Sequence, residues 1–443
     1  MLFSFSAKLP IARAILGIAS ALAGQTSAMP AELVGLTHSL PTVASLSFAS
    51  GVCRETMCSA KGYGIGARVA ARAGGTAWDG RQSRVWVSNG STLALLNVHG
   101  TRTLCKLACK PVAAPLPAGT TTRYVTGLEF VEAGVQPKPG VPGPSGRLFL
   151  SYNNQTLGWL DVRGCALGKP SFCSLLGYLG TRRIIGGLAA DDARGFLFIA
   201  TSSAVATSPA NVIYITSIEK PCAVICKFAV TVDQQKCANV RLGPITGLAY
   251  DGCSNALYIT DGRVMMYGKI QVTTNPVSCR FVHGGCCART ATEQFVGLAV
   301  KPTQPSSHGV ACTNGDCVRC PTMVGGTVGD PVLGNGDFAF TLGRAPANFT
   351  TAILAIGFGP CTSGVSLGFC GPVRIAFGPY RPLVLAFGNP RPGTNCLGEM
   401  RVPVAIPVNR GLCGLNMSVQ WIVACPRGGT GVTPCVTMKV QGI

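Results

Sequence analysis

The sequence predicts an all-β protein in which a β-propeller of five or six blades, five by repeat count, is followed by a β-sandwich. An apolar segment that begins with glycine recurs at Gly75, Gly127, Gly187, Gly247 and Gly297. The intervals of 52, 60, 60 and 50 residues are typical of blade-sized repeats. Short apolar stretches within each repeat are separated by Asp, Asn and Gly, which favour tight turns. Only 12% of the 443 residues are charged, which favours a folded, strand-rich chain over a disordered one.

The fourth repeat shows the unit most clearly. A first strand begins at Gly247, a second spans residues 257–260, and the turn at Asp261-Gly262 leads into a third. Units of three or four short strands favour radial repetition in a propeller, predicted here for residues 43–322. The fifth unit lacks a clear fourth strand, so we expect the N-terminal segment Val43–Phe48 to complete it and close the ring. A sixth blade would require a degenerate unit within residues 43–73.

The first 28 residues are predicted to be a signal peptide. Lys8 and Arg13 precede an apolar run at residues 14–23, and small residues follow. Residues 29–42 are interpreted as a linker. Beyond them no apolar run reaches the roughly 18 residues that a membrane-spanning helix needs. We therefore expect a secreted or cell-surface protein.

The chain has 22 cysteines, all beyond residue 50, and this count favours disulfides in an oxidising compartment. Many lie close to another cysteine, which favours local bonds that close short loops, although the sequence leaves the connectivity open. Each local bond would contribute about 2–3 kcal/mol. The expected local pairs are Cys53/Cys58, Cys105/Cys109, Cys165/Cys173, Cys222/Cys226, Cys361/Cys370 and Cys425/Cys435.

Three further cysteines, Cys312, Cys317 and Cys320, have the C-x4-C-x2-C spacing of one class of iron–sulfur loop. The segment also aligns without a gap with residues 257–267 of the fourth repeat. In that alignment Asn314-Gly315 occupies a hairpin turn, a position that favours this dipeptide. We therefore expect strand cysteines that form disulfides in a blade.

The pattern changes near Met323, and residues 323–336 are interpreted as a linker into a second domain. Residues 337–443 contain seven short strand candidates, a number typical of a β-sandwich. They are Phe338–Leu342, Ala352–Gly357, Val373–Phe377, Leu383–Phe387, Val402–Ile406, Ser418–Ala424 and Val436–Val440.

Two resemblances accompany these patterns. The strand-turn-strand repeats of residues 43–322 resemble secreted propeller proteins of the NHL or lactonase-like type, a resemblance that implies the fold alone. The second domain is similar to a C-terminal domain appended to secreted bacterial proteins, which implies an exported accessory module without established catalytic residues. That similarity lies in residues 336–342, 345–357, 404–408, 412–415 and 419–421.

The formal net charge is +20, from 37 basic and 17 acidic residues. Such a field favours anionic partners. We expect an anionic polysaccharide, a cell-surface component or a protein as the partner, with self-assembly as a further possibility. Aromatic residues make up only 7% of the chain, too few for the stacking platforms of nucleic-acid-binding proteins, so nucleic acid is not expected.

Acidic side chains are the candidates for a metal site. Asp79, Asp191 and Asp251 each follow a repeat glycine by four residues, a repetition that predicts a shared role in capping the next turn. Glu129 is the one acidic residue inside a Gly-Leu-x-Phe strand, and it could bind a divalent cation if it faces the central channel. The four histidines form no recognised catalytic or metal-binding motif, and no other cofactor is expected.

These observations predict a secreted, disulfide-stabilised, non-catalytic binding or cell-surface structural module that presents the loop face of its propeller to a polymer or protein. The alternative is a propeller lactonase or hydrolase with a divalent cation in the central channel. Three or more Asp, Glu or Asn side chains that converge at one channel mouth would favour the enzyme. A channel lined by Leu, Ala and Ser would favour the binding module.

Overall fold

The computed structural model describes two compact units. One lies within residues 28–302, joined by Gly442, and the other is formed by Thr303–Gln441. The described residues are 32–37, 43–49, 52–58, 69–70, 72–81, 83–98, 105–118, 123–131, 146–180, 183–203, 211–274, 277–288, 294–377, 382–388 and 395–442. The predicted signal peptide lies outside them. Among the described residues, no helix is both long and apolar enough to cross a membrane.

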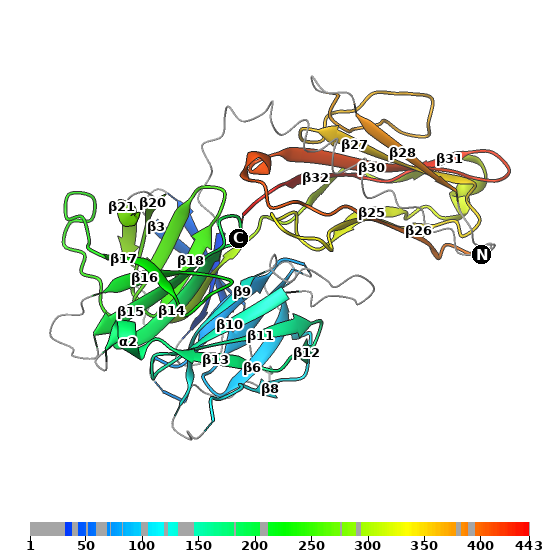
Figure 1. The fold of residues 1–443 in the computed structure, drawn as a ribbon. Coiled ribbons are helices and arrows are strands. Elements are labelled where there is room, and N and C mark those ends of the chain that lie inside the picture. The colour runs from blue at the N-terminus through cyan, green and yellow to red at the C-terminus, as the bar shows by residue number, and fades with distance from the viewer. Residues whose placement is uncertain are drawn as a thin grey trace. The chain divides into compact units, whose positions relative to one another are not determined.

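The described part of the first unit consists of five antiparallel sheets, each built on four strands and resembling a propeller blade (Figure 1). The first sheet contains β4 (Gly75–Asp79), β5 (Arg84–Ser88), β6 (Thr92–Val98) and β7 (Cys105–Leu107), with β8 (Val112–Ala113) beside β6. The second contains β9 (Val125–Val131), β10 (Gly146–Tyr152), β11 (Thr156–Arg163) and β12 (Ala166–Leu167), with β13 (Ser171–Ser174) beside β11. After the short helix α2 (Leu176–Leu179), the third contains β14 (Arg183–Asp191), β15 (Phe196–Ser203), β16 (Val212–Ser217) and β17 (Val224–Ala229). The fourth contains β18 (Gly247–Asp251), β19 (Ala256–Thr260), β20 (Val264–Thr274) and β21 (Val277–Ala288).

The fifth sheet joins the two ends of this unit. Its strand order is β22 (Phe295–Lys301), β1 (Glu32–Thr37), β2 (Val43–Ala49) and β3 (Val52–Cys58). Three N-terminal strands therefore complete the sheet, where one was predicted, and β2 reaches β22 only through β1. The interpretation of residues 29–42 as a linker is wrong, because they contain the buried strand β1. The described strands of residues 43–58 belong to this fifth sheet and form no sixth one.

The first strands of the five sheets, β4, β9, β14, β18 and β22, contact one another in a closed ring. The repeat glycines make this contact possible. A methyl group on Gly187 would lie 3.0 Å from the Cα of Gly247, one on Gly247 would lie 3.0 Å from the Cα of Gly297, and one on Gly297 would lie 2.9 Å from the Cα of Gly75. Gly127 approaches Gly187 in the same way. The glycine recurs because backbone packs directly on backbone at the centre of the ring.

Disulfides join successive sheets near their last strands. The bonds are Cys109–Cys165, Cys173–Cys222, Cys226–Cys279 and Cys237–Cys286. Their sequence separations of 56, 49, 53 and 49 residues are each close to one repeat. The local pairs Cys105/Cys109, Cys165/Cys173 and Cys222/Cys226 are therefore wrong. Cys222 bonds back to the second sheet, whereas Cys226 bonds forward to the fourth, because neighbouring sheets in a ring are one repeat apart.

Cys253 and Cys287 are also disulfide-bonded, as is Cys413 of the second unit. The expected pair Cys53/Cys58 and the side chain of Cys105 lie outside the described side chains.

The second unit has two sheets, which Figure 1 shows as two layers. The larger sheet contains β23 (Ser306–His308), β32 (Cys435–Lys439), β30 (Asn416–Ala424), β27 (Thr351–Phe358) and β28 (Leu383–Gly388), extended by β31 (Thr430–Val432) and β24 (Cys312–Thr313). The smaller one contains β25 (Val324–Val328), β26 (Ala339–Ala345) and β29 (Gly398–Pro403). Trp421 is fully buried and packs against Gly325 of the smaller sheet.

The second unit begins earlier than the sequence predicted. Residues 303–322 belong to it, and β25 lies within the predicted linker 323–336. The predicted blade hairpin at Asn314-Gly315 is wrong, because β24 pairs with β31 and a 3-10 helix, η1, spans Gly315–Arg319. Segment Val373–Phe377 is not a strand and forms only a single bridge between Val365 and Val373. Local turn chemistry cannot show that a distant strand is the pairing partner.

The disulfides of the second unit also differ from the predicted local pairs. Four of them are Cys312–Cys370, Cys317–Cys425, Cys320–Cys396 and Cys361–Cys435. Cys361/Cys370 and Cys425/Cys435 are therefore wrong as pairs, since each of these cysteines bonds across the unit.

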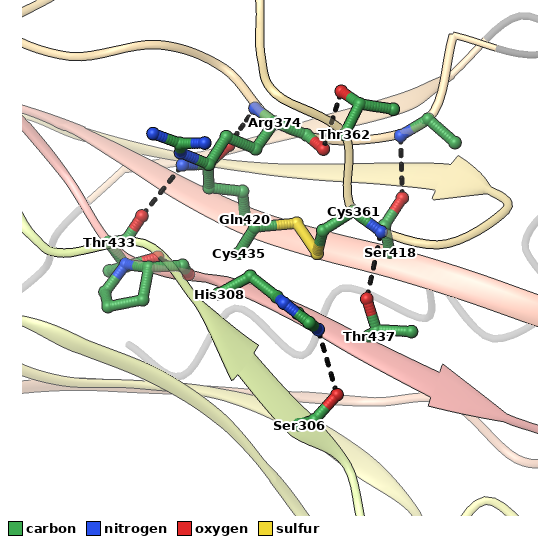
Figure 2. The surroundings of a disulfide bond; sticks show 12 residues. Ser306, His308, Cys361, Thr362, Arg374, Ser418, Gln420, Thr433, Cys435 and Thr437 are labelled. Atoms are coloured by element: carbon green, nitrogen blue, oxygen red, sulfur yellow. Dashed lines mark hydrogen bonds between the residues drawn. A yellow bond between two sulfur atoms is a disulfide. The ribbon is translucent and has the colours of Figure 1, made fainter.

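An irregular segment, residues 359–377, lies along the larger sheet (Figure 2). Polar side chains of the sheet bind its backbone. Ser418 Oγ accepts a hydrogen bond from Ala376 N at 2.8 Å, and Gln420 Oε1 accepts one from Arg374 N at 2.7 Å. Two disulfides, Cys312–Cys370 and Cys361–Cys435, link the same segment to β24 and β32. Side-chain hydrogen bonds thus replace the ladder that a regular strand would make.

Candidate functional site

Glu129 lies on the first strand of the second sheet, two residues after the repeat glycine Gly127. The corresponding residue of every other first strand is alanine: Ala77, Ala189, Ala249 and Ala299. The repeat glycines show that this face of each strand is directed toward the next sheet, because side chains two residues apart share a face. Glu129 is therefore directed toward the third sheet.

The carboxylate of Glu129 binds the backbone of the neighbouring first strand. Its Oε1 accepts a hydrogen bond from Ala190 N of β14 at 3.1 Å. The Ala190 N–H therefore makes a hydrogen bond between two sheets. Glu129 is half-buried at this contact.

Side-chain size explains why a glutamate can replace alanine here. Where other first strands meet, the alanine of one strand lies in the same core as a larger residue of the next strand. This larger residue follows the repeat glycine of its own strand by three positions. These pairs are Ala77 with Phe130, Ala189 with Tyr250, Ala249 with Val300, and Ala299 with Trp78. Between β9 and β14 the large and small side chains change places: Glu129 of β9 is the larger one, and Ala190 of β14 is the smaller one. Volume-conserving exchanges of this kind are the ones that a packed interface tolerates.

Burial raises the pKa of Glu129 well above its ordinary value, and the nearby negative charge of Asp192 raises it further. The hydrogen bond from Ala190 opposes the rise but does not cancel it. The environment therefore favours the neutral carboxyl group.

Replacing Glu129 with glutamine is expected to change the pH dependence of stability. A carboxyl group whose pKa is raised by folding stabilises the protein below its unfolded pKa, near the ordinary value of 4.5, and this contribution is lost as pH rises through the folded pKa. Stability of the natural protein should fall relative to Glu129→Gln across that interval, by at most about 1.4 kcal/mol per pH unit. Urea unfolding at several pH values measures the difference. Parallel pH profiles for the two proteins would contradict the proposed environment.

The cation site of the enzyme alternative requires more than Glu129. Among the described residues, no group of three or more His, Cys, Asp or Glu side chains is placed to hold a metal ion. The face of the first strands that carries Glu129 otherwise carries glycine and alanine at the corresponding positions. The structure thus brings Asp192 near Glu129 but does not bring the three repeated aspartates to it.

The repeated aspartates bind their own turns. Oδ1 of Asp79 accepts from Arg81 N at 3.2 Å, and Oδ1 of Asp191 accepts from Arg194 N at 3.2 Å. Asp251 accepts from Cys253 N at 2.9 Å. These contacts organise the turn between the first and second strands of each sheet.

Two arginines that sequence reasoning missed extend this arrangement to the next sheet. Arg81 forms a buried ion pair with Asp79, and its guanidinium lies 4.5 Å from the centre of the Phe130 ring. Arg194 pairs with Asp191 and donates from Nη2 to Tyr250 Oη at 2.7 Å. Burial raises the pKa of Asp79, and the charge of Arg81 opposes this rise. In the sequence, an arginine that follows the repeat aspartate by two or three residues could have indicated these contacts.

The cysteines with iron–sulfur-like spacing offer no thiolate ligand. Cys312, Cys317 and Cys320 each form a disulfide within the second unit. Of the histidines, His38 and His99 lie outside the described residues. His308 is exposed, and its Nε2 is 3.0 Å from Ser306 Oγ (Figure 2).

No protein-family model matches the chain, and no curated protein matches its sequence. Solved structures show distant similarity. Hsv2 of Kluyveromyces lactis has 8% identity and a TM-score of 0.28 over 58% of this chain and 85% of Hsv2. KlHsv2 with loop 6CD replaced by a Gly-Ser linker has 7% identity and a TM-score of 0.27 over 56% of this chain and 66% of that one. Raptor of Chaetomium thermophilum has 9% identity and a TM-score of 0.27 over 59% of this chain and 20% of Raptor. The matches thus span just under two thirds of the Hsv2 variant and one fifth of Raptor, and they carry no functional information.

Proposed function

We propose that this protein is a secreted, non-catalytic binding module, a five-bladed propeller followed by a β-sandwich, whose propeller loop face binds an anionic polysaccharide of a cell surface. The disulfides that join successive sheets carry this proposal. Bonds of this kind form and persist in oxidising, extracellular environments. Glycine contacts at the centre and disulfides between neighbouring sheets both hold the ring together, so its shape changes little. A preorganised surface of this kind loses little conformational entropy on binding.

The distribution of charge supports an anionic partner. Residues 29–302 contain 26 basic and 13 acidic residues, and residues 303–443 contain 9 and 4. Several carboxylates of the first unit, including Asp79 and Asp191, are engaged in internal ion pairs. The field outside both units is therefore positive, which raises the local concentration of a polyanion.

Affinity for anionic and neutral polysaccharides tests the proposal. Purified, oxidised full-length protein should be retained on immobilised heparin, used as a model polyanion, and should pass through immobilised dextran. The retention should weaken steeply as sodium chloride rises from 50 to about 500 mM, because salt screens exposed charges and competes for them. Equal behaviour on both matrices would refute an anionic polysaccharide as the partner.

The alternative is a lactonase or hydrolase with a divalent cation, for which Glu129 is the candidate ligand. Metal analysis of the secreted protein separates the two functions. Near-stoichiometric calcium or another divalent ion that is lost in Glu129→Gln, together with lactone hydrolysis, would support the enzyme. Concentration-dependent polymers in sedimentation would instead indicate a structural subunit of a surface layer.

A further inference from the structure

A buried histidine faces one of the disulfides that join the third and fourth sheets. His283 of β21 is 9% exposed, and its Nε2 lies 3.7 Å from Sγ of Cys237, which is bonded to Cys286. The imidazole and the Phe281 ring pack in a T-shaped arrangement. Nδ1 of His283 has no hydrogen-bond partner among the described residues. Buried polar atoms are normally paired, so this arrangement requires an explanation.

The two sulfur atoms of this disulfide differ in their surroundings. Cys237 is 3% exposed and contacts the imidazole, whereas Cys286 is half-buried. An attacking thiolate must approach along the axis of the S–S bond, so the more accessible sulfur is the electrophile and the other becomes the leaving group. The imidazole therefore lies beside the leaving group.

We propose that Cys237–Cys286 is a thiol–disulfide exchange site, at which a small external thiol forms a mixed disulfide with Cys286 and His283 stabilises the departing Cys237 thiolate. The external thiol first releases its proton to solvent. Its sulfur then forms a bond with Sγ of Cys286 as the Cys286–Cys237 bond breaks, and the electron pair leaves on Sγ of Cys237. A proton from solvent is then shared between that sulfur and Nε2 of His283, which balances the exchange.

Two charged side chains, Asp233 and Lys236, act on the imidazole in addition to burial. Burial lowers the pKa of His283, Lys236 lowers it further, and Asp233 raises it. Lys236 also donates from Nζ to the His283 carbonyl oxygen at 2.7 Å, which places an ammonium group on the backbone beside the site. The ring is therefore neutral while the disulfide is intact. A thiolate formed at Cys237 would be attracted both to Lys236 and to a protonated His283.

Limited reduction under native conditions tests the exchange. Oxidised full-length protein is treated with reduced glutathione, and free thiols and mixed disulfides are located by alkylation and mass spectrometry. We expect glutathione on Cys286, with Cys237 as the free thiol. The variant His283→Phe keeps an aromatic ring against Phe281. Its reaction should be about tenfold slower at pH 7, because loss of the imidazole raises the pKa of the leaving Cys237 thiol by about two units.

Two controls separate this role from a loosening of the fold. The Cys226–Cys279 disulfide joins β17 to β21, and its reduction rate should be the same in both proteins. In Cys286→Ser, alkylation of Cys237 should have a pH midpoint below the ordinary thiol value of about 8.5, and adding His283→Phe should raise it. Glutathione on Cys237, an unchanged rate in His283→Phe, or equal acceleration of both disulfides would overturn the proposal.

Discussion

Replacing Gly187 with alanine is expected to lower the free energy of unfolding of the first unit by about 3 kcal/mol or more. The added methyl group would lie 2.8 Å from Leu248 N and 2.9 Å from the carbonyl carbon of Gly247. Both are backbone atoms of the adjoining first strand, so no side chain can rotate away to make room. The two strands must separate, and a closed ring transmits that separation to the other junctions. Tryptophan fluorescence during urea unfolding measures the effect, since Trp78, Trp86 and Trp159 belong to this unit.

Gly177→Ala is the matched control for this experiment. A methyl group on Gly177 would meet no atom within 4 Å outside its chain neighbours and the backbone of its own helix, and its backbone does not require glycine. Its stability should stay within about 0.5 kcal/mol of the natural protein. If the two variants unfold at the same urea concentration, the first strands do not pack backbone to backbone.

Removing the Cys317–Cys425 disulfide should have the largest effect in the second unit. The two cysteines are 108 residues apart and both are buried. Closing a loop of about 100 residues restricts the unfolded chain enough to stabilise a protein by roughly 4.7 kcal/mol. Cys317→Ala/Cys425→Ala should therefore lose a stability on the order of 4–5 kcal/mol, and the alanines leave no buried hydroxyl group. Hydrogen exchange of peptides from β30 reports on this unit.

The pairing itself can be checked in a single variant. Cys317→Ala should release one free thiol, at Cys425, because that residue then lacks its bonding partner. A free thiol at Cys320 or Cys435 would show that the pairing is different. Cys226→Ala/Cys279→Ala removes a disulfide of the first unit and should leave exchange in β30 unchanged.

Features that depend on a few neighbouring residues were predictable. β4 and β18 begin at the repeat glycines Gly75 and Gly247, as the repeat predicted. Alternating apolar residues and Asp-Gly turns specify strands and hairpins over about ten residues. The segment expected to close the ring, Val43–Phe48, is in the fifth sheet, but its neighbour β1 was mistaken for a linker because one short apolar strand has little periodicity.

The all-β class and the blade-sized repeat with its glycines can be recognised from the amino-acid sequence alone, because spacing and turn chemistry are local properties. The tertiary structure was needed to show which cysteines bond, since in each of the four bonds given above for the first unit the partners are about one repeat apart on neighbouring sheets. It also decided the environment of Glu129, because the Ala190 N–H that it binds lies 61 residues further along the chain. Contacts between repeats depend on how the ring closes, and ring closure is set by the packing of all five sheets together.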